Sequence, residues 1–578
     1  MKQKTIERFK KMVKPYKKTI LIVTLMALFI DICELVKPYL LEQVMDKYLP
    51  EKLYIYNNIT TIAVIYILIV IIGNIVDYIN RITTNNMGEK VMYSLRNQLY
   101  KYIEKSNVTF HDKTPSGKLY VRVTSDTEDV YALFSEVITT FPKDIIIILG
   151  LLTMMIYMSI QLSAINILII PLLLVVTITI SKILKKIFNR SKEYRTVLNT
   201  FLAESIYGIK LIKIFNRQKE KQEECEENTK NFRNSLKNIG SFYGLLPGLI
   251  DLIENIGISL IVLFCANKWL GVNLEVGVIY LFITYLRKVF EPIDRIIENV
   301  EIVQDATSSI DKIYEILEHE EYLEDYDSGI EIKDVKGKIE FKNVWFAYED
   351  ENWILKDVSF TINPGESIAL VGKTGSGKTT ITNLINRFYK IQKGEILLDG
   401  VNINDINLKS LRKNIGTILQ DPFIFAKSLK DNIKLYSDVS DERINEAVKL
   451  ASATDFINSQ NNGINEISAE RGNSYSAGQK QLIAFARIFA QNPSIFILDE
   501  ATANIDTTTE ELIQKSVDKI SAEKTSIFIA HRLSTIVNVD KIIVLNKGKI
   551  LEQGNHSELL QKDGYYAKLY NAYYNSLN

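Results

Sequence analysis

Two long stretches without a formal charge in the first half of the chain limit what it can fold into. One covers residues 57–76, a length of 20 residues, and the other covers residues 145–181, a length of 37 residues. A helix that crosses a bilayer needs roughly 20 mostly apolar residues. The first stretch therefore predicts one membrane-spanning helix. The second is too long for one crossing and predicts two helices joined by a tight turn near residues 159–161.

Three further apolar segments are interrupted by charges and predict membrane spans less strongly. They begin near residues 19, 241 and 276, and a buried core helix is the alternative for each. Together with the uncharged stretches they give an even number of spans, which keeps both termini on one side. We therefore expect an all-α polytopic membrane domain at residues 1–320, with six spans at about residues 19–41, 57–80, 137–159, 161–184, 241–266 and 273–296.

The distribution of lysine and arginine predicts the orientation of these spans. The start of the chain is basic, and so are the long segments 81–143 and 182–240. Basic segments stay on the cytoplasmic side, so we expect a multi-pass protein of the cell membrane with both termini in the cytoplasm. Both long segments are mostly helical in pattern. The membrane helices should therefore continue past the bilayer as rods, with connections near residues 113–117 and 207–215.

Acidic residues in or beside the predicted spans have several open roles. Charges inside a membrane are costly and tend to face a polar cavity or a partner. These acids could contact a cationic amphipathic cargo, form ion pairs with Lys37 or Arg287, or lie near the interface. The residues concerned are Asp31, Glu34, Asp77, Asp251 and Glu254.

Composition excludes some other classes of protein. The formal net charge is +0, so no bulk field favours nucleic acid as a partner. The three cysteines, Cys33, Cys225 and Cys265, are not at metal-site spacing, and we expect free thiols. No small-residue cleavage site follows the first apolar run, so we expect no cleavable signal peptide.

The chain changes character at about residue 337. Short β-rich runs then alternate with helical stretches, which predicts an α/β domain with a largely parallel sheet at residues 337–578. The acidic segment 321–336 is the expected linker.

A glycine-rich loop in this half predicts a nucleotide site. Residues 372–379, Gly-Lys-Thr-Gly-Ser-Gly-Lys-Thr, fit the phosphate-loop pattern between a β run and a helical stretch. Backbone N–H groups should close on phosphate oxygens at a positive helix end. Lys378 would reach the β- and γ-phosphates of ATP, and Thr379 would hold Mg²⁺. The expected nucleotide-binding residues here are Gly372, Lys373, Thr374, Gly375, Ser376, Gly377, Lys378, Thr379 and Thr380.

A second buried strand, at residues 494–498, ends at Asp499 and Glu500. Asp499 would bind Mg²⁺ directly or through water, and Glu500 would polarise the attacking water as general base. The alternative is that Asp499 and Glu500 are ordinary acidic residues at the end of a strand. The phosphate loop upstream favours the nucleotide site over this alternative.

Over nearly its whole length the chain resembles a half-transporter of the ATP-binding cassette (ABC) exporter superfamily, of the multidrug or lipid exporter kind with the type IV exporter fold. Tyr348 matches the aromatic position that stacks on adenine, and Gln420 matches the residue linking the Mg²⁺ site to the membrane domain. Residues 476–479, Ser-Ala-Gly-Gln, match the signature motif. Asp506 matches the loop that crosses to the opposite subunit, and His531 matches the switch histidine near the γ-phosphate.

The signature motif departs from the usual Leu-Ser-Gly-Gly-Gln. Tyr475 replaces the leucine and Ala477 replaces the first glycine, whereas Ser476, Gly478 and Gln479 remain. These residues precede a helical stretch whose positive end can face a γ-phosphate. Alanine adds only a methyl group, so we expect the motif to work.

The resemblance implies composite sites, in which one subunit's phosphate loop and the other's signature segment sandwich each ATP. The chain would then need a second half-transporter, either a second copy or a different partner. The strings Ser-Ala-Gly-Gln and Ala-Thr-Ala-Asn-Ile-Asp are similar to those of the hydrolysis-competent member of paired bacterial multidrug exporters. The implied function is ATP-driven export or flipping of an amphipathic small molecule, drug or lipid. A membrane-bound ATPase that senses or gates, and a soluble phosphate-loop ATPase with a buried helical domain, are the alternatives.

Overall fold

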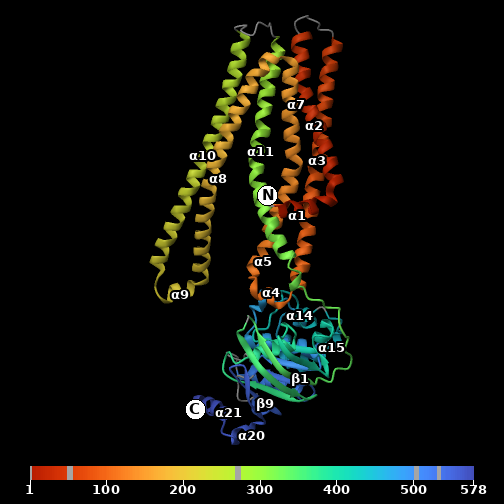
Figure 1. Ribbon diagram of the computed structural model, residues 1–578, viewed down its shortest axis with the longest axis vertical. Helices are drawn as coiled ribbons and strands as arrows, with labels where there is room; N and C mark the ends of the chain where they lie inside the picture. Colours follow the sequence, from red (N-terminus) through yellow and green to blue (C-terminus); the bar gives the residue numbers. More distant parts are fainter. Residues whose placement is uncertain are drawn as a thin grey trace. The chain divides into compact units, whose positions relative to one another are not determined.

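The computed structural model describes residues 3–48, 56–266, 275–349, 351–435, 437–499, 507–529 and 536–577 (Figure 1). The chain forms two compact units. The helical unit consists of Met1–Glu104 and Pro115–Glu320, and the sheet unit consists of Lys105–Thr114 and Glu321–Asn578.

The short segment Lys105–Thr114 belongs to the sheet unit, although its place in the sequence put it in the predicted membrane domain. Its backbone is bonded to the chain that follows the helical unit. Asn107 N donates to Tyr322 O at 2.8 Å, and Glu324 N donates to Lys105 O at 2.8 Å. These are contacts between positions far apart in the sequence, so a linear domain boundary cannot show them.

Long helices make up the helical unit, and six of the described ones run through the segments predicted to cross a membrane. The single turns η1 (Lys14–Tyr16), η2 (Val44–Tyr48) and η3 (Leu133–Val137) interrupt or end them. The helices are α1 (Gln3–Val13), α2 (Lys17–Gln43), α3 (Tyr56–Lys105), α5 (Ser116–Val123), α6 (Ser125–Ala132), α7 (Ile138–Met158), α8 (Ile160–Tyr207), α9 (Ile209–Ile214), α10 (Gln218–Ala266) and α11 (Val276–Leu317).

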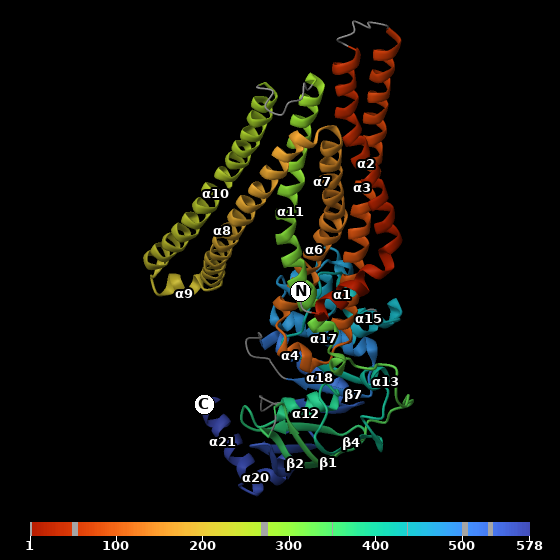
Figure 2. The ribbon, with the colours of Figure 1, turned by 45° about the horizontal axis from the view of Figure 1, so that its top comes forward.

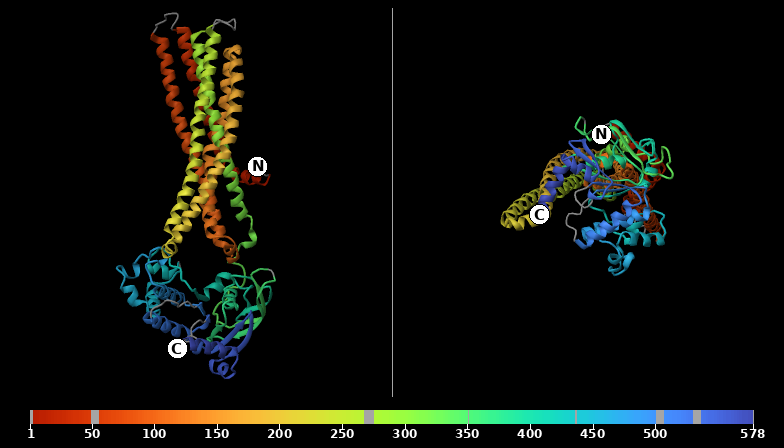
Figure 3. Two further views of the ribbon diagram at one scale, coloured as in Figure 1. Left: turned by 90° about the vertical axis from the view of Figure 1, so that its left-hand side faces the viewer. Right: turned by 90° about the horizontal axis from the view of Figure 1, so that it is seen from below.

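The predicted tight turn and one predicted rod connection are confirmed. Helix α7 ends at Met158 and α8 begins at Ile160, with Ser159 between them in an extended conformation. The hydroxyl of Ser159 accepts a hydrogen bond from Leu162 N at 3.4 Å and so caps α8. Helices α8 and α10 lie side by side and are joined by α9 (Figure 2, Figure 3).

Four helical segments in the described residues are long and apolar enough to cross a membrane. In the segment Ile59–Lys105, 0% of the most apolar window is buried inside the chain. Such a surface on a single chain is what a lipid-facing helix requires. The predicted total of six spans stays a prediction. The segments are Lys4–Tyr48, Ile59–Lys105, Ser116–Met158 and Gly248–Cys265.

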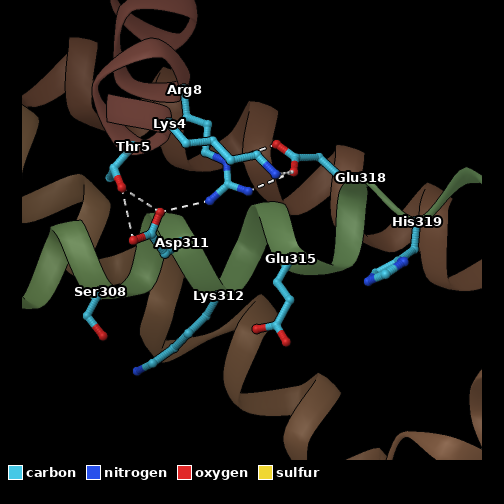
Figure 4. A pocket seen from close by; sticks show the side chains of 9 residues that line it. All are labelled: Lys4, Thr5, Arg8, Ser308, Asp311, Lys312, Glu315, Glu318 and His319. Atoms are coloured by element: carbon cyan, nitrogen blue, oxygen red, sulfur yellow. Dashed lines mark hydrogen bonds and ion pairs between the residues drawn. The ribbon is translucent and has the colours of Figure 1, made fainter. Parts of the chain in front are cut away.

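Helix α1 is tied to the carboxyl end of α11 by charged side chains (Figure 4). The guanidinium of Arg8 donates two hydrogen bonds to Glu318, at 2.9 and 2.7 Å, and one to Asp311 at 2.8 Å. Thr5 also donates to Asp311, and Lys4 forms an ion pair with Glu318 at 2.8 Å. The N-terminal helix is therefore fixed to the last helix of the helical unit, beside a cavity of about 560 Å³.

The sheet unit contains two sheets, and the prediction of an α/β domain is confirmed. The order of the larger sheet is β10-β9-β3-β8-β7-β6, and the order of the smaller is β2-β1-β4-β5. In the larger sheet β6, β7, β8, β3 and β9 are parallel, and β10 is antiparallel to β9. The strands are β1 (Ile339–Ala347), β2 (Trp353–Ile362), β3 (Ser367–Val371), β4 (Lys393–Leu398), β5 (Val401–Asn402), β6 (Ile415–Ile418), β7 (Ile495–Asp499), β8 (Thr525–Ile529), β9 (Lys541–Asn546) and β10 (Lys549–Gly554).

Strand β3 lies inside the larger sheet and is buried on both faces. Ile368 and Leu370 pack into one apolar cluster, whereas Ala369 and Val371 pack into another. Alternate side chains of a strand point to opposite faces, so apolar side chains on both faces fix β3 between two layers of helix and sheet. The helices of this unit are α4 (Val108–Lys113), α12 (Lys378–Ile385), α13 (Leu408–Lys413), α14 (Leu429–Lys434), α15 (Asp441–Leu450), α16 (Thr454–Asn458), α17 (Ala477–Gln491), α18 (Thr507–Ser521), α20 (His556–Gln561) and α21 (Tyr565–Leu577).

Candidate functional site

The predicted phosphate loop lies between β3 and α12, at the carboxyl end of the parallel sheet. The backbone at Gly377 has a φ of +105°, and a Cβ there would lie 2.7 Å from Leu355 Cδ2. A Cβ on Gly372 would lie 2.2 Å from the carbonyl oxygen of Leu545, on the neighbouring strand β9. Both positions therefore require glycine. Without side chains at these positions, the backbone of the loop packs closely against the edge of the sheet. Ligands of open α/β sheets bind at this edge.

Lys378 begins α12 and folds back over the loop. Its side chain is buried, and Nζ donates hydrogen bonds to Gly372 O at 2.6 Å and to Lys373 O at 3.3 Å. Burial lowers the pKa of Lys378, and the charge of Asp499 opposes that shift. Lys378, expected to bind the phosphates, thus lies within electrostatic range of Asp499, which is expected to bind Mg²⁺.

Ser376 supplies a direct test of whether an anion fits the loop. Its hydroxyl oxygen is buried and has no hydrogen-bond partner among the described residues. Buried polar groups are normally satisfied, and a loop of consecutive backbone N–H groups is a site for phosphate oxygens. A nucleotide phosphate would satisfy this hydroxyl, so the residues present fit ATP.

Tyr348 presents an aromatic ring beside the start of α12. Its hydroxyl donates to Thr380 Oγ1 at 3.2 Å, which fixes the ring to the helix that leaves the loop. The ring meets Phe346 and Tyr389 edge-on, at centroid distances of 4.8 and 4.9 Å. With 43% of the residue exposed, an aromatic face is left for a base to stack on.

Oxygen-bearing residues follow neighbouring strands at this edge. Asp499 ends β7 and is level with Ile529 of β8, which is itself level with Leu370 of β3. Gln420 lies two residues after the end of β6, the strand that pairs with β7 on its other side. Thr379 lies exposed in the first turn of α12. Hydroxyl, amide and carboxylate oxygens are ligands that suit Mg²⁺.

The signature segment caps helix α17. Ser476 is the N-cap, and its hydroxyl accepts from Gln479 N at 3.2 Å while Ser476 N donates to Gln479 Oε1 at 2.9 Å. This reciprocal pair is a capping box. Among the described residues, none of the hydrogen bonds of residues 476–479 reaches the phosphate loop of the same chain.

Tyr475 is a core residue, which explains the departure from the usual leucine. It is 9% exposed, packs edge-on against Phe456 at 5.5 Å, and its hydroxyl lies 3.3 Å from Ser468 Oγ. The tyrosine therefore fills an apolar position and has a hydrogen-bond partner for its hydroxyl. Ala477 is exposed at the start of α17.

Three predicted site residues, Glu500, Asp506 and His531, lie outside the described residues. Conversely, sequence reasoning missed Tyr389 and Asp112. Tyr389 packs against Tyr348 and donates a hydrogen bond to the carboxylate of Asp112, on α4. A tyrosine among 30 gives no signal by itself.

Several acidic residues of the predicted spans form ion pairs in the structure. Glu34 pairs with Lys37 and with Lys288, and Glu254 pairs with Arg287 at 3.0 Å. Asp77 pairs with Arg81 at 2.8 Å. These pairs include both of the cations proposed from the sequence.

Two family models match the chain, in the same order as its two units. The ABC transporter transmembrane region matches residues 20–293, and the ABC transporter model matches residues 355–503.

Curated relatives and a solved structure cover most of the chain. It is 35% identical to the probable multidrug resistance ABC transporter ATP-binding/permease protein YheH of Bacillus subtilis, over 84% of this chain and 72% of that protein. It is 33% identical to the ATP-dependent lipid A-core flippase of Syntrophus aciditrophicus, over 87% of this chain and 84% of the flippase. Its fold matches a bacterial Atm1-family ABC exporter with ATP bound, with a TM-score of 0.77, 24% identity, and coverage of 96% of this chain and 98% of that one.

Proposed function

Because this chain belongs to the ABC transporter family and is an exporter half-transporter, we propose that it exports or flips an amphipathic small molecule, drug or lipid, as one half of a dimer. Membership of this family makes the chain part of an ATP-driven membrane transporter. The cargo, the partner and the division of labour within the nucleotide site are the proposal.

Each nucleotide site is composed of two chains in this proposal. The observation that carries it is the exposed start of α17, where Ser476 forms its capping bonds with Gln479 and none with the phosphate loop of its own chain, among the described residues. A helix start of this kind attracts anions. In a dimer the Ser476 segment of one chain would face the γ-phosphate bound by the loop of the other. ATP would then hold the two chains together, and hydrolysis would release them.

The described residues of the site would bind three parts of the substrate complex, which are the phosphates, the adenine and Mg²⁺. Lys378 and the loop N–H groups would hold the β- and γ-phosphates, and the ring of Tyr348 would stack on adenine. Mg²⁺ would be held by the oxygens of Thr379, Gln420 and Asp499, and when bound it would neutralise charge that develops on the phosphates.

The remaining proposed roles belong to residues outside the described ranges. Glu500 would take a proton from the attacking water as general base. His531 would contact the γ-phosphate, and Asp506 would contact the opposite chain.

An amphipathic cargo is supported by the names of the relatives and by the apolar helices. One relative is named as a multidrug resistance transporter and another as a lipid A-core flippase, and both kinds of molecule join an apolar part to a polar part. The basic start of the chain and its basic interhelical segments support a cytoplasmic position for the termini and the sheet unit. A membrane-bound ATPase that senses or gates is the runner-up, and only movement of a cargo separates it from a pump.

Dimers of defined composition test the composite site. Two differently tagged copies allow mixed dimers to be purified, one copy carrying Lys378→Ala and the other Ser476→Arg. A composite arrangement leaves one intact site in this mixed dimer, so it should regain ATP hydrolysis that neither parent dimer shows. Recovery of the chain only as a monomer would favour a different half-transporter as the partner.

The matched control places both substitutions in one copy and pairs it with a wild-type copy. Composite sites predict that this dimer is inactive, because each site then has one damaged half. If each chain instead forms its own site, the control dimer keeps half of the activity and the first mixed dimer has none.

A further inference from the structure

One acidic side chain in the helical unit is buried without an ion pair or a hydrogen bond to any residue that the structure describes. Asp31 of α2 is 2% exposed, and neither Oδ1 nor Oδ2 has a hydrogen-bond partner among the described residues. Among the described residues Asp31 therefore lacks the ion pair with Lys37 or Arg287 that was one of the roles open to it. A buried polar group without a partner is uncommon in a folded protein and needs a physical explanation.

The helices around Asp31 are closely packed. Helix α2 packs against α7 and α11. One turn beyond Asp31, the carbonyl of Leu35 accepts a hydrogen bond from Tyr285 of α11 at 2.8 Å. On the α7 side, a Cβ added to Gly150 would lie 2.9 Å from Leu35 Cδ1. In the described structure Asp31 is therefore enclosed by helices of its own chain, and 2% of the residue is exposed.

The charged groups near Asp31 are committed to other partners or lie only within electrostatic range. Those that act on it through space are Glu34 of α2, Lys143 and Asp144 of α7, and Arg295 of α11. Glu34 already has two lysine partners. Arg295 donates from Nε and Nη2 to Oδ1 of Asp144, at 3.1 and 2.8 Å.

Asp31 and Asp144 are thus a pair of buried carboxyl groups, and among the described residues only Asp144 is bonded to the guanidinium of Arg295. Asp144 is 0% exposed, and its Oδ2 also lacks a partner among the described residues, so the pair has three unpartnered oxygens. An ionised carboxylate buried without a partner is costly, whereas a neutral carboxylic acid is not charged and loses far less. When two nearby carboxyl groups cannot both ionise, one of them keeps a proton. Asp144 is bonded to the arginine, whereas Asp31 has no such partner among the described residues, so Asp31 is the one of the two that is held as the neutral acid.

We infer that Asp31 is a proton-binding site, occupied while α2 stays packed against α7 and α11 and emptied when these helices separate and water reaches the carboxyl group. The ligand is a proton rather than a metal cation, because a cation such as Mg²⁺ or Ca²⁺ needs about six oxygen ligands and this enclosure offers few. The packed arrangement binds one more proton than a separated one. By linkage, lowering the pH favours the packed arrangement and raising the pH favours separation. This goes beyond ATP-driven export, because it couples the helix packing to a second ligand.

Difference infrared spectroscopy of the full-length protein in lipid vesicles tests the site. The wild type should show the carbonyl band of a protonated carboxylic acid at neutral pH, and Asp31→Asn should lose that band. Asp251→Asn, which changes an exposed acid of α10, should keep it. A wild type without the band, or a band that survives in Asp31→Asn, would overturn the inference.

A second variant keeps the test valid if Asp31→Asn does not fold. Asp144→Asn frees Arg295, which can then pair with Asp31 and stabilise its ionised form. The band should therefore disappear although Asp31 is still present. Persistence of the band in Asp144→Asn would contradict the inference that Asp31 holds this proton. Loss of the band from the wild type on addition of sodium or potassium ions at constant pH would also contradict it.

Discussion

Tyr389 donates a hydrogen bond to the carboxylate of Asp112, and the same ring packs edge-on against Tyr348 with 4.9 Å between centroids. One residue of the sheet unit therefore contacts both the short helix α4 and the aromatic ring expected to bind adenine. Burial, together with the hydrogen bond to Asp112, raises the pKa of Tyr389, so the phenol stays protonated and remains a donor.

Tyr389→Phe should separate the two contacts. The ring that supports Tyr348 remains, so the affinity for ATP should change less than about twofold. The lost bond is one to a charged group, a kind that contributes about 1.5–3 kcal/mol, so α4 should be held less firmly and ATP hydrolysis should fall severalfold. Asp112→Ala, which removes the acceptor, should give the same loss, and combining both substitutions should add little. Wild-type hydrolysis in Tyr389→Phe would show that the bond has no functional role.

Tyr475 should be a stability residue rather than a nucleotide contact. Tyr475→Phe keeps the ring and removes the hydrogen bond to Ser468, which should lower the free energy of unfolding by about 1 kcal/mol. Tyr475→Ala should cost about 3–5 kcal/mol through the cavity it leaves. Thermal unfolding and ATPase assays at low temperature check both variants. An unchanged unfolding transition in Tyr475→Ala, or a large loss of ATP affinity in Tyr475→Phe, would contradict this role.

The link between α1 and α11 should depend on pH. Hydrogen bonds from Arg8 and then Lys4 lower the pKa of Glu318 to about 2 from its usual 4.5. Since the folded-state pKa is the lower one, the stabilisation is present above about pH 4.5 and is lost as the pH falls towards 2.

Arg8→Gln is the variant that measures this stabilisation. Glu318 is 38% exposed, so solvent screening limits the contribution to on the order of 1 kcal/mol. The difference in unfolding free energy between wild type and Arg8→Gln should be constant from pH 7 to pH 5 and should shrink below pH 4.5. A difference that does not change with pH would mean that the carboxylate charge of Glu318 does not contribute.

Glu500→Gln should retain ATP binding and nearly abolish turnover. The amide cannot accept a proton from the attacking water, whereas the loop residues proposed to bind the phosphates are unchanged. Filter-binding and phosphate-release assays on the same preparation measure the two steps separately. Steady-state phosphate release near the wild-type rate would remove Glu500 from the role of general base.

Much of the fold follows from local sequence pattern. The uncharged lengths predict the membrane helices, and the position of Ser159 predicts the turn that α7 and α8 form. The phosphate loop is also local, because residues 372–379 carry their own glycines and the lysine that closes over them.

Contacts between distant positions could not be predicted in this way. The bond between Tyr389 and Asp112 joins residues separated by 277 positions, and the pair of Arg295 with Asp144 joins residues separated by 151. Nothing in the local sequence distinguishes Asp31, which lacks a partner among the residues that the structure describes, from Glu34, which has two. The sequence also assigned Lys105–Thr114 to the membrane domain, because its bonds to residues 322–324 form only on folding.

Movement of a probe across proteoliposome membranes tests the central claim most directly, which is that the Lys378 loop drives transport. Wild-type protein, with its partner chain if one is required, should move a fluorescent lipid or a fluorescent amphipathic drug on addition of ATP and Mg²⁺. Lys378→Ala should lose ATP binding and probe movement together, because the buried ammonium no longer reaches the phosphates. Undiminished ATP affinity and probe movement in Lys378→Ala would contradict the account.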